Sequence, residues 1–236
     1  MIRQLITSDS RINIEAVTDK SALVVGDPDL KGFLTQLPGA LEEAKTVAAL
    51  LKDEGFDTRE LMRESQDVIV PALVSSNYKI IHLAGHGVFD ADPDKPSGMV
   101  IGKNNFLTTA EIAQMSTTPE LVFVNCCFLG KTDGVAEEFF QSRFKLAANI
   151  GTQLINNGVK AVVVAGWAVD DGAALLFAKK FYENMFAGKT FGEAVRLARE
   201  QVYNDFGKKN TWGAYQTYGD PFYKLREIKS KWGIKN

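Results

Sequence analysis

The sequences KIIHLAGHG at residues 79–87 and LVFVNCC at residues 121–127 decide the fold of this chain. The first part of each is mostly apolar and lacks regular polar alternation, which is typical of a parallel strand covered on both faces. Each then passes into residues that can carry chemistry, namely His86 in the first and the neighbouring Cys126 and Cys127 in the second. We therefore expect two central strands with reactive side chains just beyond their ends.

Similar apolar runs alternate with segments of helical spacing along the rest of the chain. The predicted strands are Ala22–Gly26, Thr58–Met62, Lys79–Ala84, Leu121–Asn125, Lys160–Trp167 and Tyr215–Tyr218. The predicted helices are 41–51, a segment from Ser65 that Pro71 interrupts, a short helix from Thr108 to Met115 with Glu111 in a capping box, 174–185, and 190–206. This alternation predicts an α/β fold with a mostly parallel sheet of about six strands covered by helices.

Composition and charge narrow the functional classes. The chain has 236 residues, with 27 Lys and Arg against 29 Asp and Glu and a net charge of −2, so no nucleic-acid-binding footprint is expected. The longest strongly apolar stretch, residues 161–169, is about half a membrane span, and no membrane partner is expected. We expect one domain over residues 21–225, with 1–20 a leader or the stub of a larger architecture and 226–236 a solvated basic tail.

Cysteine and histidine content sets further limits. The two cysteines are neighbours and cannot connect distant parts of a fold, so the chain is not a disulfide scaffold and a reducing cytoplasm is the expected compartment. Two histidines nearly exclude a multi-histidine metal site. The loop at 90–98 spaces aspartates like the start of a calcium loop, but Lys95 and Ile101 stand where glycine and glutamate are needed. We expect a solvated turn there, and no metal.

The two strand ends predict a thiol beside an imidazole. In open parallel sheets, ligand sites form at the carboxyl ends of the strands, and neighbouring strands lie about 4.8 Å apart. A thiol with a nearby imidazole base is the basic requirement for cysteine acyl transfer. We expect Cys127 and His86 in these roles, since His82 and Cys126 fall inside their strands as core residues. The spacing alone leaves open a flavodoxin-like domain with incidental polar loops.

The order of the motifs resembles the CHAT family of caspase-like cysteine proteases, a group related to caspases, separases, gingipains and clostripain. The motifs are HLAGHGVFD (82–90), VFVNCCFLG (122–130), GVKAVVVAGWAVDDGAA (158–174) and YGDP (218–221). The resemblance covers residues 22–223. It implies a three-layer caspase-like sandwich and a cysteine endopeptidase that needs no cofactor and acts on protein substrates. It also implies a regulatory sensor or repeat domain or protein as partner, and a role in bacterial defence or regulated cell death.

The resemblance assigns the catalytic residues by motif. The family's histidine stands in an H-G pair, which matches His86-Gly87, and its cysteine in A-C-x-T-G, which matches Cys127 counted back from Gly130. The backbone N–H groups of Gly87 and Cys127 would form the oxyanion hole. Phe128 and Leu129 depart from the family's pattern after the cysteine. A scaffold that binds a protein partner without turnover is therefore the alternative.

The resemblance also names candidate substrate-binding residues. Asn125 lies where related proteases place a residue of the pocket for the side chain before the cut. Trp167, Asp170 and Asp171 are similar to a separase pattern of Trp, Val and Asp, and an aspartate there would hold an incoming Arg or Lys. Either aspartate could instead simply cap the next helix, and Trp167 could be a core aromatic rather than a pocket wall.

Overall fold

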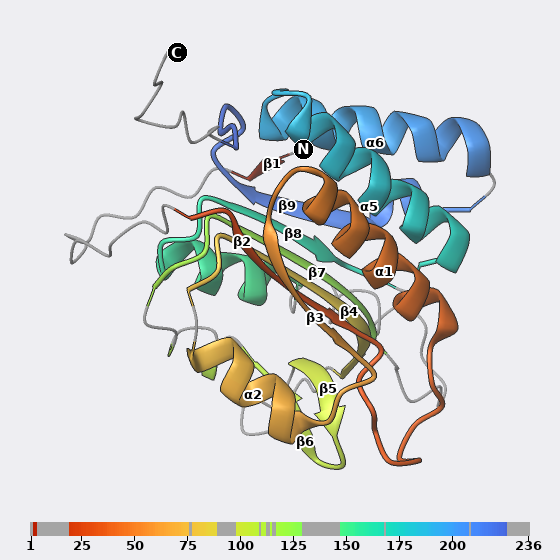
Figure 1. Ribbon diagram of the computed structural model, residues 1–236. Helices are drawn as coiled ribbons and strands as arrows, with labels where there is room; N and C mark the ends of the chain where they lie inside the picture. Colours follow the sequence, from red (N-terminus) through yellow and green to blue (C-terminus); the bar gives the residue numbers. More distant parts are fainter. Residues whose placement is uncertain are drawn as a thin grey trace.

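A mixed sheet forms the middle of the molecule, with helices on both faces (Figure 1). The computed structural model describes residues 2–3, 19–75, 77–88, 98–108, 110–111, 114, 117–128, 147–167, 169–207 and 209–225. The acidic loop expected at 90–98 lies outside these ranges except for Gly98. Also outside them are Leu129 and Gly130, the tail at 226–236, most of residues 1–20 and part of the short helix expected up to Met115.

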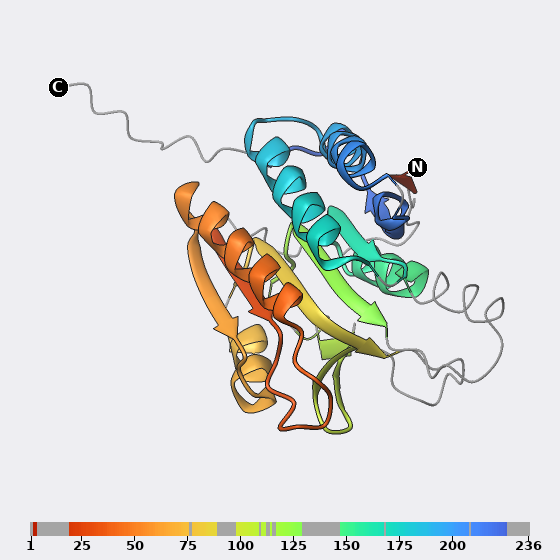
Figure 2. The same cartoon turned by 90° about the vertical axis from the view of Figure 1, so that its right-hand side faces the viewer.

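The sheet among the described residues has nine strands. They are β1 (Ile2–Arg3), β2 (Ser21–Gly26), β3 (Asp57–Met62), β4 (Ile80–Val88), β5 (Gly98–Gly102), β6 (Asn105–Leu107), β7 (Leu121–Phe128), β8 (Ala161–Ala165) and β9 (Tyr215–Gly219). Their order is β1-β9-β8-β7-β4-β2-β3, with β5 pairing β4 and β6 at the side. The adjacent strands β3, β2, β4, β7 and β8 run parallel to one another, whereas β9 is antiparallel to β8. In Figure 2 the arrowheads of β4 and β7 end side by side at one edge.

Helices cover the two faces separately and complete three layers. The helices α1 (Pro38–Asp53), α5 (Asp171–Phe186) and α6 (Phe191–Phe206) pack on one face, and α7 (Thr211–Ala214) follows them. The helix α2 (Gln66–Ser75) and the helical residues 147–156 pack on the other. Apolar residues alternate along the strands between these layers, so β2, β4, β7, β8 and β9 each contribute to two cores. We call the side of α1, α5 and α6 the α1 face.

The six predicted strands correspond to β2, β3, β4, β7, β8 and β9, so the predicted fold class is confirmed. The two boundaries that matter for the site were wrong, because β4 continues through His86 and β7 through Cys127. The hydrogen-bonded ladder between the two strands extends past their apolar stretches and keeps both residues in the sheet. The helix α2 also runs through Pro71, since it buries Ile69 before the proline and Leu73 after it.

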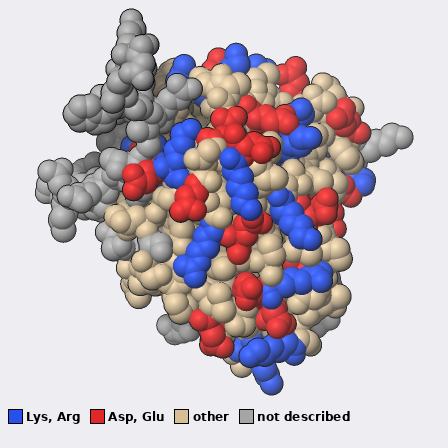
Figure 3. Space-filling model, in the orientation of Figure 1, with Lys and Arg blue, Asp and Glu red and all other residues tan. Residues whose placement is uncertain are grey.

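The surface carries both signs of charge. On the face of Figure 3, lysines and arginines are interspersed with aspartates and glutamates, in keeping with the net charge of −2. Within the described residues, no helix is long and apolar enough to cross a membrane.

Candidate active site

The register between β4 and β7 pairs His86 with Cys127. The two strands are parallel, and their pairing runs from Ile80 opposite Leu121 to Gly87 opposite Phe128. Directly opposed residues on neighbouring strands lie about 4.8 Å apart. Both residues sit within the last three positions of their strands, at the carboxyl edge of the sheet.

Alternation along the strands separates the two histidines and the two cysteines by role. Cys126 is buried in the core on the side of α2, with 1% of its surface exposed, as predicted for a core filler. Phe123 belongs to the core on the α1 face, and positions 125 and 127 continue its odd-numbered series along β7. His82 is fully buried on this same face, where it contacts Phe123, which confirms the predicted core role.

A backbone carbonyl oxygen selects the tautomer of the neutral His86 ring. Nε2 of His86 lies 2.6 Å from the carbonyl oxygen of Thr35. A carbonyl oxygen can only accept a hydrogen bond, so Nε2 carries the proton and the neutral ring has its lone pair on Nδ1. Nδ1 is buried and has no hydrogen-bond partner among the described residues. His86 therefore presents an unused basic nitrogen at the carboxyl edge of the sheet.

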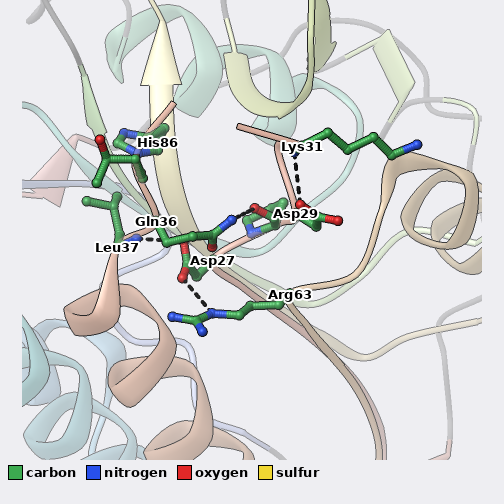
Figure 4. Close-up of polar contacts among 9 residues, drawn as sticks. Asp27, Asp29, Lys31, Gln36, Leu37, Arg63 and His86 are labelled. Atoms are coloured by element: carbon green, nitrogen blue, oxygen red, sulfur yellow. Dashed lines mark hydrogen bonds and ion pairs between the residues drawn. The ribbon is translucent and has the colours of Figure 1, made fainter. Parts of the chain in front are cut away.

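Asp27 holds the loop that carries this carbonyl oxygen (Figure 4). Its buried carboxylate accepts a hydrogen bond from the backbone N–H of Leu37 at 2.8 Å and pairs with Nε of Arg63 at 3.1 Å. With its nitrogen turned toward Asp27, the side-chain amide of Gln36 donates to the same carboxylate at 2.7 Å. Gln36 and Leu37 directly follow Thr35 in the chain, so these contacts place the Thr35 carbonyl group.

Asn125 belongs to a buried polar group that we call the Glu43 network. The amide Nδ2 of Asn125 donates to Oε2 of Glu43, and Oε1 of Glu43 lies 3.1 Å from Nε2 of His82. The hydroxyl of Tyr182 lies 3.3 Å from Nδ1 of His82. All four side chains are at least nine-tenths buried. Burial raises the pKa of Tyr182 well above its ordinary value, and the negative charge of Glu43 adds to the rise.

Asp170 caps the helix α5. Its Oδ1 accepts a hydrogen bond from the backbone N–H of Ala173 at 3.2 Å, and its Oδ2 pairs with Nζ of Lys209 at 2.5 Å. The hydrogen bond from Lys209 holds the pKa of Asp170 below its ordinary value, and the bond from Ala173 also lowers it. The alternative role as a helix cap therefore accounts for Asp170.

Asp171 follows Asp170 in the first turn of α5, and Trp167 precedes this helix by a few residues. Asp171 is exposed in the first turn of α5, and its carboxyl group packs on Gly39, where an added Cβ would lie 2.3 Å from Cγ of Asp171. Asp171 therefore borders the first turn of α1 as well as of α5. Trp167 is half-buried against the core of the α1 face.

Gly87 follows His86 in β4, opposite Phe128.

Sequence reasoning missed Thr35, Asp27 and Glu43. Thr35 acts through its backbone, which carries no signal in the sequence. Asp27 and Glu43 contact residues far along the chain, and the one local signal that could have drawn attention to Asp27 is the GDP sequence at 26–28 after a buried strand. The described residues contain no group of three or more His, Cys, Asp or Glu side chains arranged to hold a metal ion.

The model of the CHAT domain family matches residues 3–220, which is most of the chain. The chain belongs to the CHAT family. No curated protein sequence matches this CHAT chain. The family and the caspase-like fold together support a cysteine endopeptidase.

Solved structures share the fold at low sequence identity. The Arg-specific cysteine proteinase gingipain R is 12% identical, with a TM-score of 0.58, and the match covers 91% of this chain and 50% of gingipain R. The complex of the pro- and mature domains of RgpB from Porphyromonas gingivalis matches at 13% identity and a TM-score of 0.55, over 91% and 51% of the two chains. A Geobacter sulfurreducens protein matches at 15% identity and a TM-score of 0.52, over 88% and 97%. The CHAT chain spans about half the length of the gingipain chains.

Proposed function

We propose that this CHAT protein hydrolyses peptide bonds in protein substrates, with Cys127 as nucleophile and His86 as general base and acid. The observation that carries the proposal is the register that sets His86 opposite Cys127 on adjacent parallel strands. The unused Nδ1 of His86 supports it, since a base needs a lone pair that the fold has not already engaged.

The proposed reaction has two halves. The sulfur of Cys127 attacks the carbonyl carbon of the scissile bond while Nδ1 of His86 takes the thiol proton. His86 then gives this proton to the leaving amine as the C–N bond breaks, which leaves a thioester on Cys127. Water, deprotonated by His86, attacks the thioester, releases the carboxylic acid product and regenerates the thiol. No cofactor takes part in either half.

The backbone N–H groups of Gly87 and Cys127 are the proposed oxyanion donors. The tetrahedral intermediate carries its negative charge on the former carbonyl oxygen, and such donors are worth about 100- to 1000-fold in turnover each. Gly87 suits the position because a glycine leaves room for the substrate carbonyl group beside it. The Thr35 carbonyl oxygen completes the arrangement by holding the His86 ring.

A preference for Arg or Lys before the cut is the proposed specificity. Asp171 is exposed and lies beside the start of α1, whereas Asp170 is already paired with Lys209 and caps α5. Asp171 is thus the better candidate to receive a basic side chain by a charge-assisted hydrogen bond. Trp167 is the proposed wall of this pocket, and Asn125 lies deeper along β7.

A regulatory partner is the last part of the proposal. RgpB, which shares this fold, has been solved in a complex of its pro- and mature domains, so a protein with this fold binds a further domain. We expect a sensor or repeat domain or protein to activate this protease in the cytoplasm, in bacterial defence or regulated cell death.

Cleavage of a peptide panel that varies the residue before the cut tests the proposal. We expect Cys127→Ala and His86→Ala to abolish cleavage. The matched variant Cys126→Ala, which changes a core residue on the side of α2, should retain it. Cleavage that survives Cys127→Ala would refute the assignment. A wild-type protein inert toward every peptide, with and without candidate activating partners, would favour the non-enzymatic scaffold.

A further inference from the structure

Glu43 is the carboxylate of a small buried polar group that apolar core residues surround. It lies on α1 with 1% of its surface exposed, among residues of the core on the α1 face. Burying an ionised carboxylate is unfavourable unless hydrogen bonds and opposite charge compensate it. The described ionisable groups that face it are His82 and Tyr182, and neither is a permanent cation. Such a group needs a reason to be there other than stability.

The contact with Glu43 fixes the orientation of the Asn125 amide. Carboxylate oxygens only accept hydrogen bonds, so Asn125 must turn its NH₂ group toward Glu43. Its carbonyl oxygen Oδ1 then faces away from Glu43. This oxygen is buried and accepts no hydrogen bond from any residue that the structure describes. A buried acceptor left without a donor is unfavourable, and a bound ligand with N–H groups would satisfy it.

The position of Asn125 identifies the ligand group. Asn125 precedes the proposed nucleophile by two residues on β7, and two residues span about 6.6 Å along a strand. A substrate whose carbonyl carbon sits at Cys127 can therefore place a long side chain over Asn125. Lys and Arg side chains are long, carry only donors at their ends, and are positively charged. The buried charge of Glu43 behind the amide favours the same ligand.

We propose that Glu43 determines specificity for a basic residue before the cut, by turning the Asn125 carbonyl oxygen toward the substrate and placing a negative charge behind it. The inference rests on the proposed function and deepens it. An asparagine alone favours neither donors nor acceptors, because its amide can rotate. Glu43 removes that freedom, and so part of the pocket's selectivity is set by a side chain that does not contact the substrate, in addition to the direct contact proposed for Asp171.

Matched substrates test this role. Two pairs of peptides differ only in charge before the cut, Lys against norleucine and Arg against citrulline, and the measured quantity is the ratio of kcat/KM within each pair. Loss of a charge-assisted interaction corresponds to about a tenfold change or more. We expect Glu43→Gln to lower both ratios by about tenfold, since the new amide no longer dictates how Asn125 turns. The matched control Glu42→Gln removes an exposed carboxylate from the adjacent position of α1 and should leave the ratios unchanged.

A double variant separates specificity from packing. Combining Glu43→Gln with Asn125→Asp exchanges the carboxylate and the amide while keeping their hydrogen bond, and it directs a carboxylate oxygen to the substrate. We expect the double variant to recover the preference for Lys and Arg, which a merely structural role of Glu43 would not produce. If Glu43→Gln does not fold, as judged by circular dichroism, Asn125→Ala removes the same acceptor and should lower the ratios in the same way.

The outcomes distinguish the two levels of the account. A wild-type protein whose cleavage does not depend on Cys127 would overturn the proposed function, and this inference with it. Cys127-dependent cleavage with the same ratios in wild type, Glu43→Gln and Asn125→Ala would overturn the inference alone and leave the protease assignment standing.

Discussion

At the scale of single residues, the hydrogen bond from His86 to Thr35 links the loop after β2 to the chemistry at the end of β4. The donation from Nε2 selects the tautomer in which Nδ1 keeps its lone pair for the proposed role as base. Asp27 supports this contact. Its φ is 48°, a value that residues other than glycine seldom adopt. Its buried carboxylate compensates by binding Leu37, Gln36 and Arg63 at once. We therefore regard Asp27 as a positioning residue for His86.

The isosteric change Asp27→Asn tests this role. It removes the charge that pairs with Arg63 and one of the acceptors that anchor the loop, so the Thr35 carbonyl group loses its fixed place. We expect kcat to fall by about 10- to 100-fold with little change in KM, because small misplacements of catalytic groups cost rates of this size. Asp29→Asn, in the same loop, is the control. Equal effects of the two changes would show that the loop is merely structural.

At the scale of elements, paired strands and the first turns of two helices assemble the site. The strands β4 and β7 bring His86 and Cys127 into register, and α1 adds Glu43 from one side. The helix α5 begins beside α1, where Gly39 allows the carboxyl group of Asp171 to approach closely. This arrangement separates the two neighbouring aspartates, since Asp170 caps α5 and Asp171 is left as the proposed pocket residue.

Substitution of each aspartate by asparagine and alanine separates these tasks. Asp170→Ala removes the cap of α5 and should lower the free energy of unfolding in urea by about 1 kcal/mol, whereas Asp170→Asn retains most of the cap. Asp171→Asn should have little effect on stability but reduce the preference for Lys and Arg in peptide assays. A preference that follows Asp170 instead would reverse the assignment.

The sequence predicted the elements better than the contacts between them. Runs such as ALVVG at 22–26 and AVVVA at 161–165 are too apolar for anything but buried strands, and both were found. The ends of β4 and β7 were missed because interstrand hydrogen bonds, rather than side-chain pattern, carry the strands through glycine and histidine. The contact of Thr35 with His86 joins residues that are 51 positions apart, and that of Glu43 with Asn125 joins residues that are 82 positions apart. Local sequence patterns cannot predict such distant pairs.

At the scale of the whole molecule, Glu120 joins three distant parts of the chain at the edge of the sheet opposite the site. Its carboxylate lies 2.6 Å from Nζ of Lys160, 2.8 Å from the hydroxyl of Tyr223 and 3.8 Å from Nζ of Lys79. Burial alone would raise the pKa of Glu120. The hydrogen bonds from Lys160 and Tyr223 and the charges of both lysines outweigh burial, so the pKa lies below its ordinary value.

This lowered pKa predicts how stability depends on pH. A carboxyl group whose pKa falls on folding stabilises the protein above its unfolded pKa, and this stabilisation is lost as pH falls through the folded pKa. Glu120→Gln should therefore cost about 1–3 kcal/mol of unfolding free energy at neutral pH, and the difference from wild type should shrink below the ordinary glutamate value of 4.5. Urea titrations across this range, with Glu42→Gln as control, measure it. A difference independent of pH would contradict the assignment.

The most direct measurement of the central claim is covalent trapping of the nucleophile. A peptidyl acyloxymethyl ketone with Lys before the reactive carbonyl group reacts with an active cysteine and leaves a stable thioether, which peptide mapping by mass spectrometry can locate. We predict one adduct per chain, on the sulfur of Cys127, and its loss in His86→Ala because that variant has no base to activate the thiol. An adduct on Cys126, or equal labelling of Cys127 with and without His86, would contradict the account.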